Sequence, residues 1–233
     1  MFEPEEFSFS LAEFRGVARL FPLPNLVMFP QVMQPLHIFE PRYRALFEEA
    51  LADDKLIALA TLEPGWEPHY EGRPPLRPAA CLCRIATHTN LPDGCYNVLL
   101  IGLRRIRLKN ELPPHKLFRE AEVEVLEDDY PLFNAPARPG LQRRLVKDFK
   151  RALPKLSEVQ EHLDQLLGAQ VPLGLLTDII AYTLQLPLEV KLQLLAEPDV
   201  DRRANTLLSH LTCEGEPPRP AGDQPFPPAF SVN

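Results

Sequence analysis

The sequence of 233 residues lacks the features that mark several large classes of protein. Its four cysteines are too few for a disulfide framework in a chain of this size, which indicates a reducing compartment. No apolar run approaches the ~18 residues that a membrane-spanning helix needs. The acidic start, MFEPEE at 1–6, has no basic segment followed by an apolar one, and so predicts no signal peptide. We therefore expect a cytoplasmic protein with no membrane partner.

Signatures of catalysis are missing as well. The sequence contains no G-x-x-x-x-G-K-[ST] phosphate loop, no G-x-S-x-G nucleophile turn and no H-E-x-x-H metal pair. None of its serines lies in a glycine-rich turn that would expose a nucleophile. The formal net charge of −7 disfavours a general nucleic-acid binder, which needs surplus Lys and Arg to neutralise phosphates. The sequence therefore predicts no enzyme, no cofactor and no nucleic-acid partner.

Proline, by contrast, is abundant, at 27 residues. In the segment 20–44, LFPLPNLVMFPQVMQPLHIFEPRYR, four prolines separate short apolar runs: Pro22, Pro24, Pro30 and Pro35. Because proline fixes φ and cannot donate to a β-ladder, these runs predict short edge strands broken by kinks. Glu40-Pro41 predicts the start of a helix, with proline in its first turn.

Apolar periodicity predicts strands in the first half of the chain and helices in the second. The expected elements are a helix at 41–53, a buried strand at 56–62, a hairpin of strands 79–89 and 95–103 around Leu91-Pro92-Asp93-Gly94, an alternating strand at 118–126, and helices within 141–211. Strands followed by helices indicate an α+β fold with segregated parts.

These segments, in this order, resemble the Lon N-terminal domain, the substrate-recognition module of Lon proteases. After segment 20–44 the resemblance rests on LIALA at 56–60, PGWE at 64–67, CRI at 83–85, LPDG at 91–94, YNVLL at 96–100, GLRR at 102–105, AEVEVL at 121–126, LGLLTD at 173–178 and LPLEVK at 186–191. It implies a PUA-like pseudo-β-barrel followed by a helical bundle. Lon proteases carry ATPase and peptidase domains downstream, and this sequence ends before either could start. The resemblance therefore implies recognition of polypeptides and no protease activity.

The same pattern divides the chain into five parts. We expect an N-terminal extension at 1–16, the barrel at 17–130, a linker at 131–140, the helical bundle at 141–213 and a disordered proline-rich tail at 214–233.

Three residues are candidates for contact with a bound peptide or partner: Trp66, Tyr70 and Arg104. Trp66 is the only tryptophan and lies in a proline- and glycine-containing loop close to Tyr70, and exposed aromatics on loops often anchor partners. The alternative is that Trp66 seals its loop onto the barrel. Arg104 belongs to a set of arginines that could bind acidic groups, or could pair with carboxylates such as Glu40.

Other kinds of site receive less support from the pattern. Cys81, Cys83 and Cys95 could ligate zinc, but C-x-C spacing is a weak match and small apolar strand residues explain them equally well. We therefore predict no metal site. The basic helix at 141–153 leaves RNA binding by a PUA-like barrel open as an alternative function, although a solvated face explains its charges. An enzyme with an unrecognised site near His37 and Glu40 is the other alternative. The identity of the ligand and the oligomeric state stay open.

Overall fold

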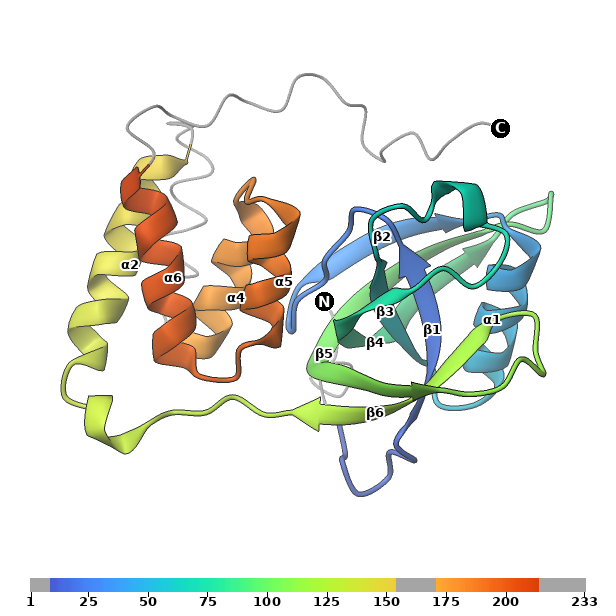
Figure 1. Cartoon of the computed structure of the whole chain (residues 1–233), viewed down its shortest axis with the longest axis horizontal. Helices are drawn as coiled ribbons and strands as arrows, with labels where there is room; N and C mark the ends of the chain where they lie inside the picture. The colour runs from blue at the N-terminus through green and yellow to red at the C-terminus, as the bar shows by residue number, and fades with distance from the viewer. Residues whose placement is uncertain (1–8, 154–170, 214–233) are drawn as a thin grey trace. The chain divides into compact units, whose positions relative to one another are not determined.

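A computed structural model describes residues 9–153 and 171–213 (Figure 1); the predicted tail at 214–233 lies outside these ranges. Its elements are, in chain order, β1 (Val17–Leu23), β2 (Met33–Ile38), α1 (Pro41–Ala52), β3 (Leu56–Leu62), η2 (Glu67–His69), β4 (Leu76–Asn90), β5 (Tyr96–Glu111), β6 (Arg119–Leu126), η3 (Leu132–Asn134), α2 (Arg138–Ala152), α4 (Leu173–Thr183), α5 (Leu188–Ala196) and α6 (Val200–Cys213). Strands precede helices apart from α1, so the predicted α+β class is confirmed.

The strands form a closed sheet. Within the described part of the chain, six strands follow the order β2-β5-β4-β3-β1-β6, and a further pairing between β5 and β6 closes the barrel. Strand β5 makes this possible because it is long: its first residues pair with β2, its last with β6, and most of its length with β4. The predicted barrel is therefore confirmed.

The proline-containing strands differ in their placement. β2 lies at the edge of the sheet and pairs with β5 alone among the described strands, as the sequence predicts. β1, however, is an interior strand between β3 and β6, so the predicted edge position is wrong for it. Pro22 is tolerated there because the pairing with β6 ends at Leu20, and beyond that residue β1 has β3 as its neighbour.

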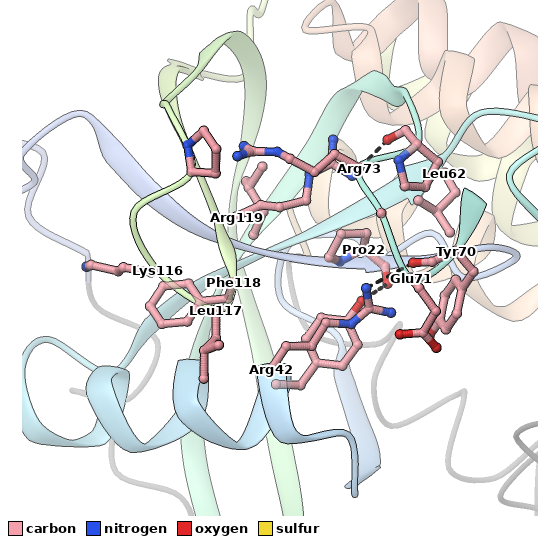
Figure 2. A pocket seen from close by; sticks show the side chains of 15 residues that line it. Pro22, Arg42, Leu62, Tyr70, Glu71, Arg73, Lys116, Leu117, Phe118 and Arg119 are labelled. Carbon is pink, nitrogen blue, oxygen red and sulfur yellow. Dashed lines mark hydrogen bonds between the residues drawn. The ribbon is translucent and has the colours of Figure 1, made fainter.

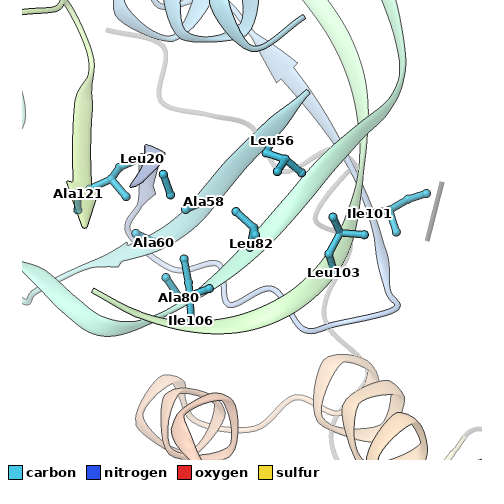
Figure 3. Close-up of a cluster of buried hydrophobic side chains, with 11 residues drawn as sticks. Leu20, Leu56, Ala58, Ala60, Ala80, Leu82, Ile101, Leu103, Ile106 and Ala121 are labelled. Atoms are coloured by element: carbon cyan, nitrogen blue, oxygen red, sulfur yellow. The ribbon is translucent and has the colours of Figure 1, made fainter. Parts of the chain in front are cut away.

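Small and branched residues fill the interior of the barrel (Figure 3). The buried cluster comprises Ala18, Leu20, Leu56, Ala58, Ala60, Ala80, Leu82, Ile101, Leu103, Ile106 and Ala121. Gly102 marks a close approach of two backbone segments: its N–H donates to Val32 O over 2.9 Å and its carbonyl accepts from Gln31 N–H over 2.8 Å. A Cβ atom added at Gly102 would lie 2.0 Å from the carbonyl oxygen of Phe29. This position therefore requires glycine.

The chain divides into two compact units, Met1–Glu127 with Leu186–Ala196, and Asp128–Gln185 with Glu197–Asn233. The first unit includes α5, which packs against β4 and β5. Arg77 of β4 pairs with Glu63, Nε to Oε2 at 3.0 Å, and also with Glu189 of α5. Helix α5 lies within the range 141–213 that the sequence analysis assigned to the helical bundle, but it belongs to the barrel unit.

In the second unit, α6 packs against both α2 and α4. Asp199 caps α6, because its Oδ1 accepts from the N–H groups of Asp201 and Arg202 over 2.9 and 3.0 Å. Arg203 is 1% exposed and donates to both carboxylate oxygens of Asp128, at 2.7 and 3.0 Å. The range expected as a linker, 131–140, contains η3 and the first residues of α2.

Candidate functional site

A pocket of about 200 Å³ opens on the barrel unit beside the start of α1 (Figure 2). It is built by β1, β3, the start of α1, the loop before β4 and the segment leading into β6. Its lining residues are Leu20, Pro22, Arg42, Tyr43, Leu62, Tyr70, Glu71, Gly72, Arg73, Pro74, Pro114, Lys116, Leu117, Phe118 and Arg119.

Apolar side chains make up much of this lining. The side chains of Pro22, Tyr43, Leu62 and Phe118 are buried in the barrel unit and present their surfaces to the cavity. Leu117, in contrast, is 73% exposed. Leu117 and Phe118 lie on one side of the pocket and Tyr70 on the other (Figure 2). The pocket therefore offers an apolar surface with an exposed leucine at its border.

A hydrogen-bonded network fixes the side of the pocket that Tyr70 forms. The Tyr70 hydroxyl donates to Glu40 Oε1 over 2.6 Å, and Arg42 donates to Glu40 Oε2 from Nη2 over 2.8 Å. Arg42 Nη1 also donates to the carbonyl of Tyr70 over 2.9 Å. Burial and the hydrogen bond to Glu40 raise the pKa of Tyr70 to about 12. The loop that carries Tyr70 is thus held to the start of α1 by the ion pair of Arg42 with Glu40 and by the hydrogen bonds of both residues to Tyr70.

The three predicted contact residues do not all meet. Trp66 and Tyr70 pack together, with ring centroids 5.3 Å apart and ring planes inclined by 64°, but Trp66 is half-buried and is not among the residues that line the pocket. Arg104 is not part of the pocket: its guanidinium lies over the ring of Phe9, 5.4 Å from the centroid, and donates to Leu103 O. Sequence reasoning missed Leu117 and Phe118, which no local motif distinguishes.

The cations around the pocket are already paired. Arg73 and Arg119 both bind the carboxylate of Glu111, the first at 2.8 Å. Lys116 Nζ lies 2.7 Å from Glu49 Oε1 and 3.0 Å from Glu120 Oε1. Because carboxylates neutralise these charges, the pocket is better suited to an uncharged apolar group than to an anion.

The other sequence candidates have different surroundings. His37 Nδ1 lies 2.9 Å from Asn97 Oδ1, whereas Glu40 is engaged by Arg42 and Tyr70, so the two do not form a pair. Cys81 and Cys83 are buried in β4. Among the residues that the structure describes, no cluster of three or more His, Cys, Asp or Glu side chains could hold a metal ion. Nor does any helix in those ranges have the length and apolar character to cross a membrane.

Comparisons with known proteins point to one family. Residues 17–213 match the family described as the ATP-dependent protease La (LON) substrate-binding domain. A Lon protease of Heliobacterium modesticaldum is 28% identical over 204 residues, covering 84% of this chain and 24% of that protein. Lon protease 2 of Myxococcus xanthus is 26% identical over 200 residues, covering 86% of this chain and 24% of that protein. The chain thus spans about a quarter of the length of the curated relatives it matches.

Two solved structures share the fold. The N-terminal domain of Mycobacterium avium complex Lon protease superposes with a TM-score of 0.65 at 17% identity, covering 84% of this chain and 98% of that one. The Lon N-terminal domain protein from Xanthomonas campestris superposes with a TM-score of 0.58 at 22% identity, covering 83% of this chain and 97% of that one.

Proposed function

Since the chain belongs to the family of Lon substrate-binding domains, we propose that it binds exposed segments of polypeptides through the pocket beside Tyr70, without catalysing a reaction on them. The substrate-binding domain of this family is itself non-catalytic. The observation that carries the proposal is an apolar cavity whose bordering cations are neutralised by carboxylates. A cytoplasmic location is part of the same proposal and rests on the low cysteine content.

The dimensions of the pocket favour one large side chain as its occupant. Burying a leucine or phenylalanine side chain contributes ~1.5–3 kcal/mol. Ordering a flexible peptide opposes that gain, so we expect modest affinity for any single segment. Unfolded chains expose many such side chains, whereas folded proteins bury them. Selectivity for unfolded polypeptides then follows from the accessibility of the apolar side chain.

Titration of the purified protein with an uncharged apolar peptide tests this proposal, and Trp66 is a built-in fluorescent reporter because it packs on Tyr70. We expect the peptide to shift the Trp66 emission and a permanently unfolded protein to compete for the same site. The substitution Leu117→Ser should weaken binding several-fold, since it removes exposed apolar surface at the border of the pocket.

Leu11→Ser is the matched control, because Leu11 is also an exposed leucine of the barrel unit but does not line the pocket. Binding that both substitutions leave unchanged would place the peptide elsewhere and overturn the proposed site. The rival functions receive no comparable support. RNA binding was expected to use the basic helix at 141–153, but the chain as a whole carries a net charge of −7. Glu40 is engaged by Arg42 and Tyr70 rather than by His37.

A further inference from the structure

The second unit carries a cationic surface on α2 that the proposed function does not use. Six cations and one carboxylate lie within the 15 residues of this helix, although the whole chain has a net charge of −7. Arg143, Lys147 and Arg151 recur every fourth residue and so form a row along one side of α2. Asp148, the carboxylate of α2, pairs with Arg151 at 3.3 Å. In the described ranges, no carboxylate lies within ion-pair distance of Arg143 or Lys147.

An open groove of about 620 Å³ adjoins this row. Its lining comes from η3, the first half of α2 and the start of α6: Asn134, Ala137, Arg138, Gly140, Leu141, Arg143, Arg144, Asp201 and Asn205. Arg138 is bound to Asp201, with Nη2 2.8 Å from Oδ2, whereas Arg143 and Arg144 are exposed. A Cβ atom added at Gly140 would meet no atom within 4 Å. The groove therefore combines free space with positive charge that has no carboxylate partner among the described residues.

Two large apolar side chains stand beside the groove. Leu132 and Phe133 directly precede Asn134, which lines it, and they are 89% and 83% exposed. Side chains of this size are usually buried, and adjacent exposed ones indicate a surface for a partner. The neighbouring α2 does not cover them, because its own apolar residues Leu145 and Phe149 are buried within the unit.

We propose that this groove binds an acidic segment of a partner polypeptide, with carboxylates on Arg143, Arg144 and Lys147 and apolar side chains on Leu132 and Phe133. Cations spaced about 6 Å apart along a helix match alternate side chains of an extended peptide, which are about 6.6 Å apart. A nucleic acid fits less well, because the carboxylate of Asp201 lies in the groove and the chain is acidic overall. A lipid surface fits less well, since α2 has no free apolar face.

Binding of a short fluorescent peptide in which Glu alternates with Leu tests this proposal on the full chain. We expect saturable binding that weakens with salt, and little binding of the same peptide with Gln in place of Glu. The double substitution Arg143→Glu and Arg144→Glu should weaken the binding about tenfold or more, because it reverses the charge that faces the peptide. Gly140→Trp should weaken it as well, by filling the groove without changing charge.

A matched variant separates the effect of charge at the groove from a general one. Arg202→Glu makes the same charge change at an exposed arginine of α6 that does not line the groove. It should bind within about twofold of the parent. If the reversed pair fails to fold by circular dichroism, Arg143→Gln with Arg144→Gln replaces it. Equal binding of the Gln peptide, an unaffected double variant, or preferential binding of single-stranded RNA or anionic vesicles would overturn the proposal. The site is independent of the pocket beside Tyr70, so neither result decides the other.

Discussion

Gly102 lies where the segment before β2 crosses strand β5, and the substitution Gly102→Ala should be strongly destabilising. The added Cβ would lie 2.0 Å from Phe29 O, an atom of the backbone that cannot rotate away. We expect the free energy of unfolding to fall by about 3 kcal/mol, measured from the urea midpoint. Gly140→Ala is the control: its Cβ meets nothing and alanine favours helices, so it should not destabilise. Equal midpoints for the two variants would show that the barrel can relax around position 102.

Asp201 should make the second unit sensitive to acid. Hydrogen bonds from Arg138 lower the pKa of the Asp201 carboxyl below its usual 3.8, although burial alone would raise it. A carboxyl with a depressed pKa in the folded state stabilises fully above pH 3.8, and the stabilisation is lost as the pH falls through the lower folded value. Asp201→Asn should therefore cost about 2 kcal/mol at neutral pH and progressively less below pH 3.8. Urea unfolding of both proteins across this pH range measures the destabilisation. A destabilisation that does not change with pH would contradict the role of the ionised Asp201 carboxyl.

Among single residues, the sequence predicted part of the candidate site. Trp66 and Tyr70 are four residues apart, so their proximity is a local property, and the structure brings their rings together. Leu117 and Phe118 reach the same pocket only because β6 pairs with β1, which no short motif encodes. Arg104 looked suitable by charge, but the register of β5 directs it to Phe9.

Among the elements, β2 is the strand at the edge of the sheet, and Pro35 protects it. Proline has no N–H to donate to the neighbouring strand β5. We therefore infer that the nitrogen of Pro35 faces the free edge of β2, where a donor would otherwise be exposed. Pro35→Thr restores a donor there and should promote association between sheet edges, seen by light scattering as a mass that grows with protein concentration. Met33→Thr, two residues earlier on the same face, changes no donor and should leave the mass unaltered. A monodisperse Pro35→Thr protein would show that other features protect this edge.

Sequence patterns predicted the bounds of helices and strands better than they predicted which strands pair. The strand predicted at 56–62 has those bounds in the structure, and α1 ends one residue before its predicted limit. The pairing of β1 was predicted wrongly. Its proline indicated a strand at the edge of the sheet, whereas β1 has a neighbouring strand on both sides over part of its length. Periodicity shows which face of an element is apolar, but not which surface covers it.

For the whole molecule, α5 sets the limits of the barrel unit. Although α5 follows α4 in sequence, it packs on β4 and β5 and is linked to Arg77. A fragment ending at Glu127 would therefore leave apolar surface of the sheet uncovered. We expect it to bind a hydrophobic dye and to melt at a lower temperature than the full chain. A fragment that melts like the full chain and binds no dye would show that α5 is dispensable.

The pairing of β1 with β6 joins Val17 to Glu122, two residues that lie far apart in the chain. A ribosome adding 5–20 residues per second needs roughly 5–20 seconds to synthesise the sequence between them. During that interval one side of the first strand has no neighbour, and the interior of the barrel stays accessible to water. A nascent chain of this protein thus presents, for several seconds, the kind of exposed apolar segment that chaperones recognise.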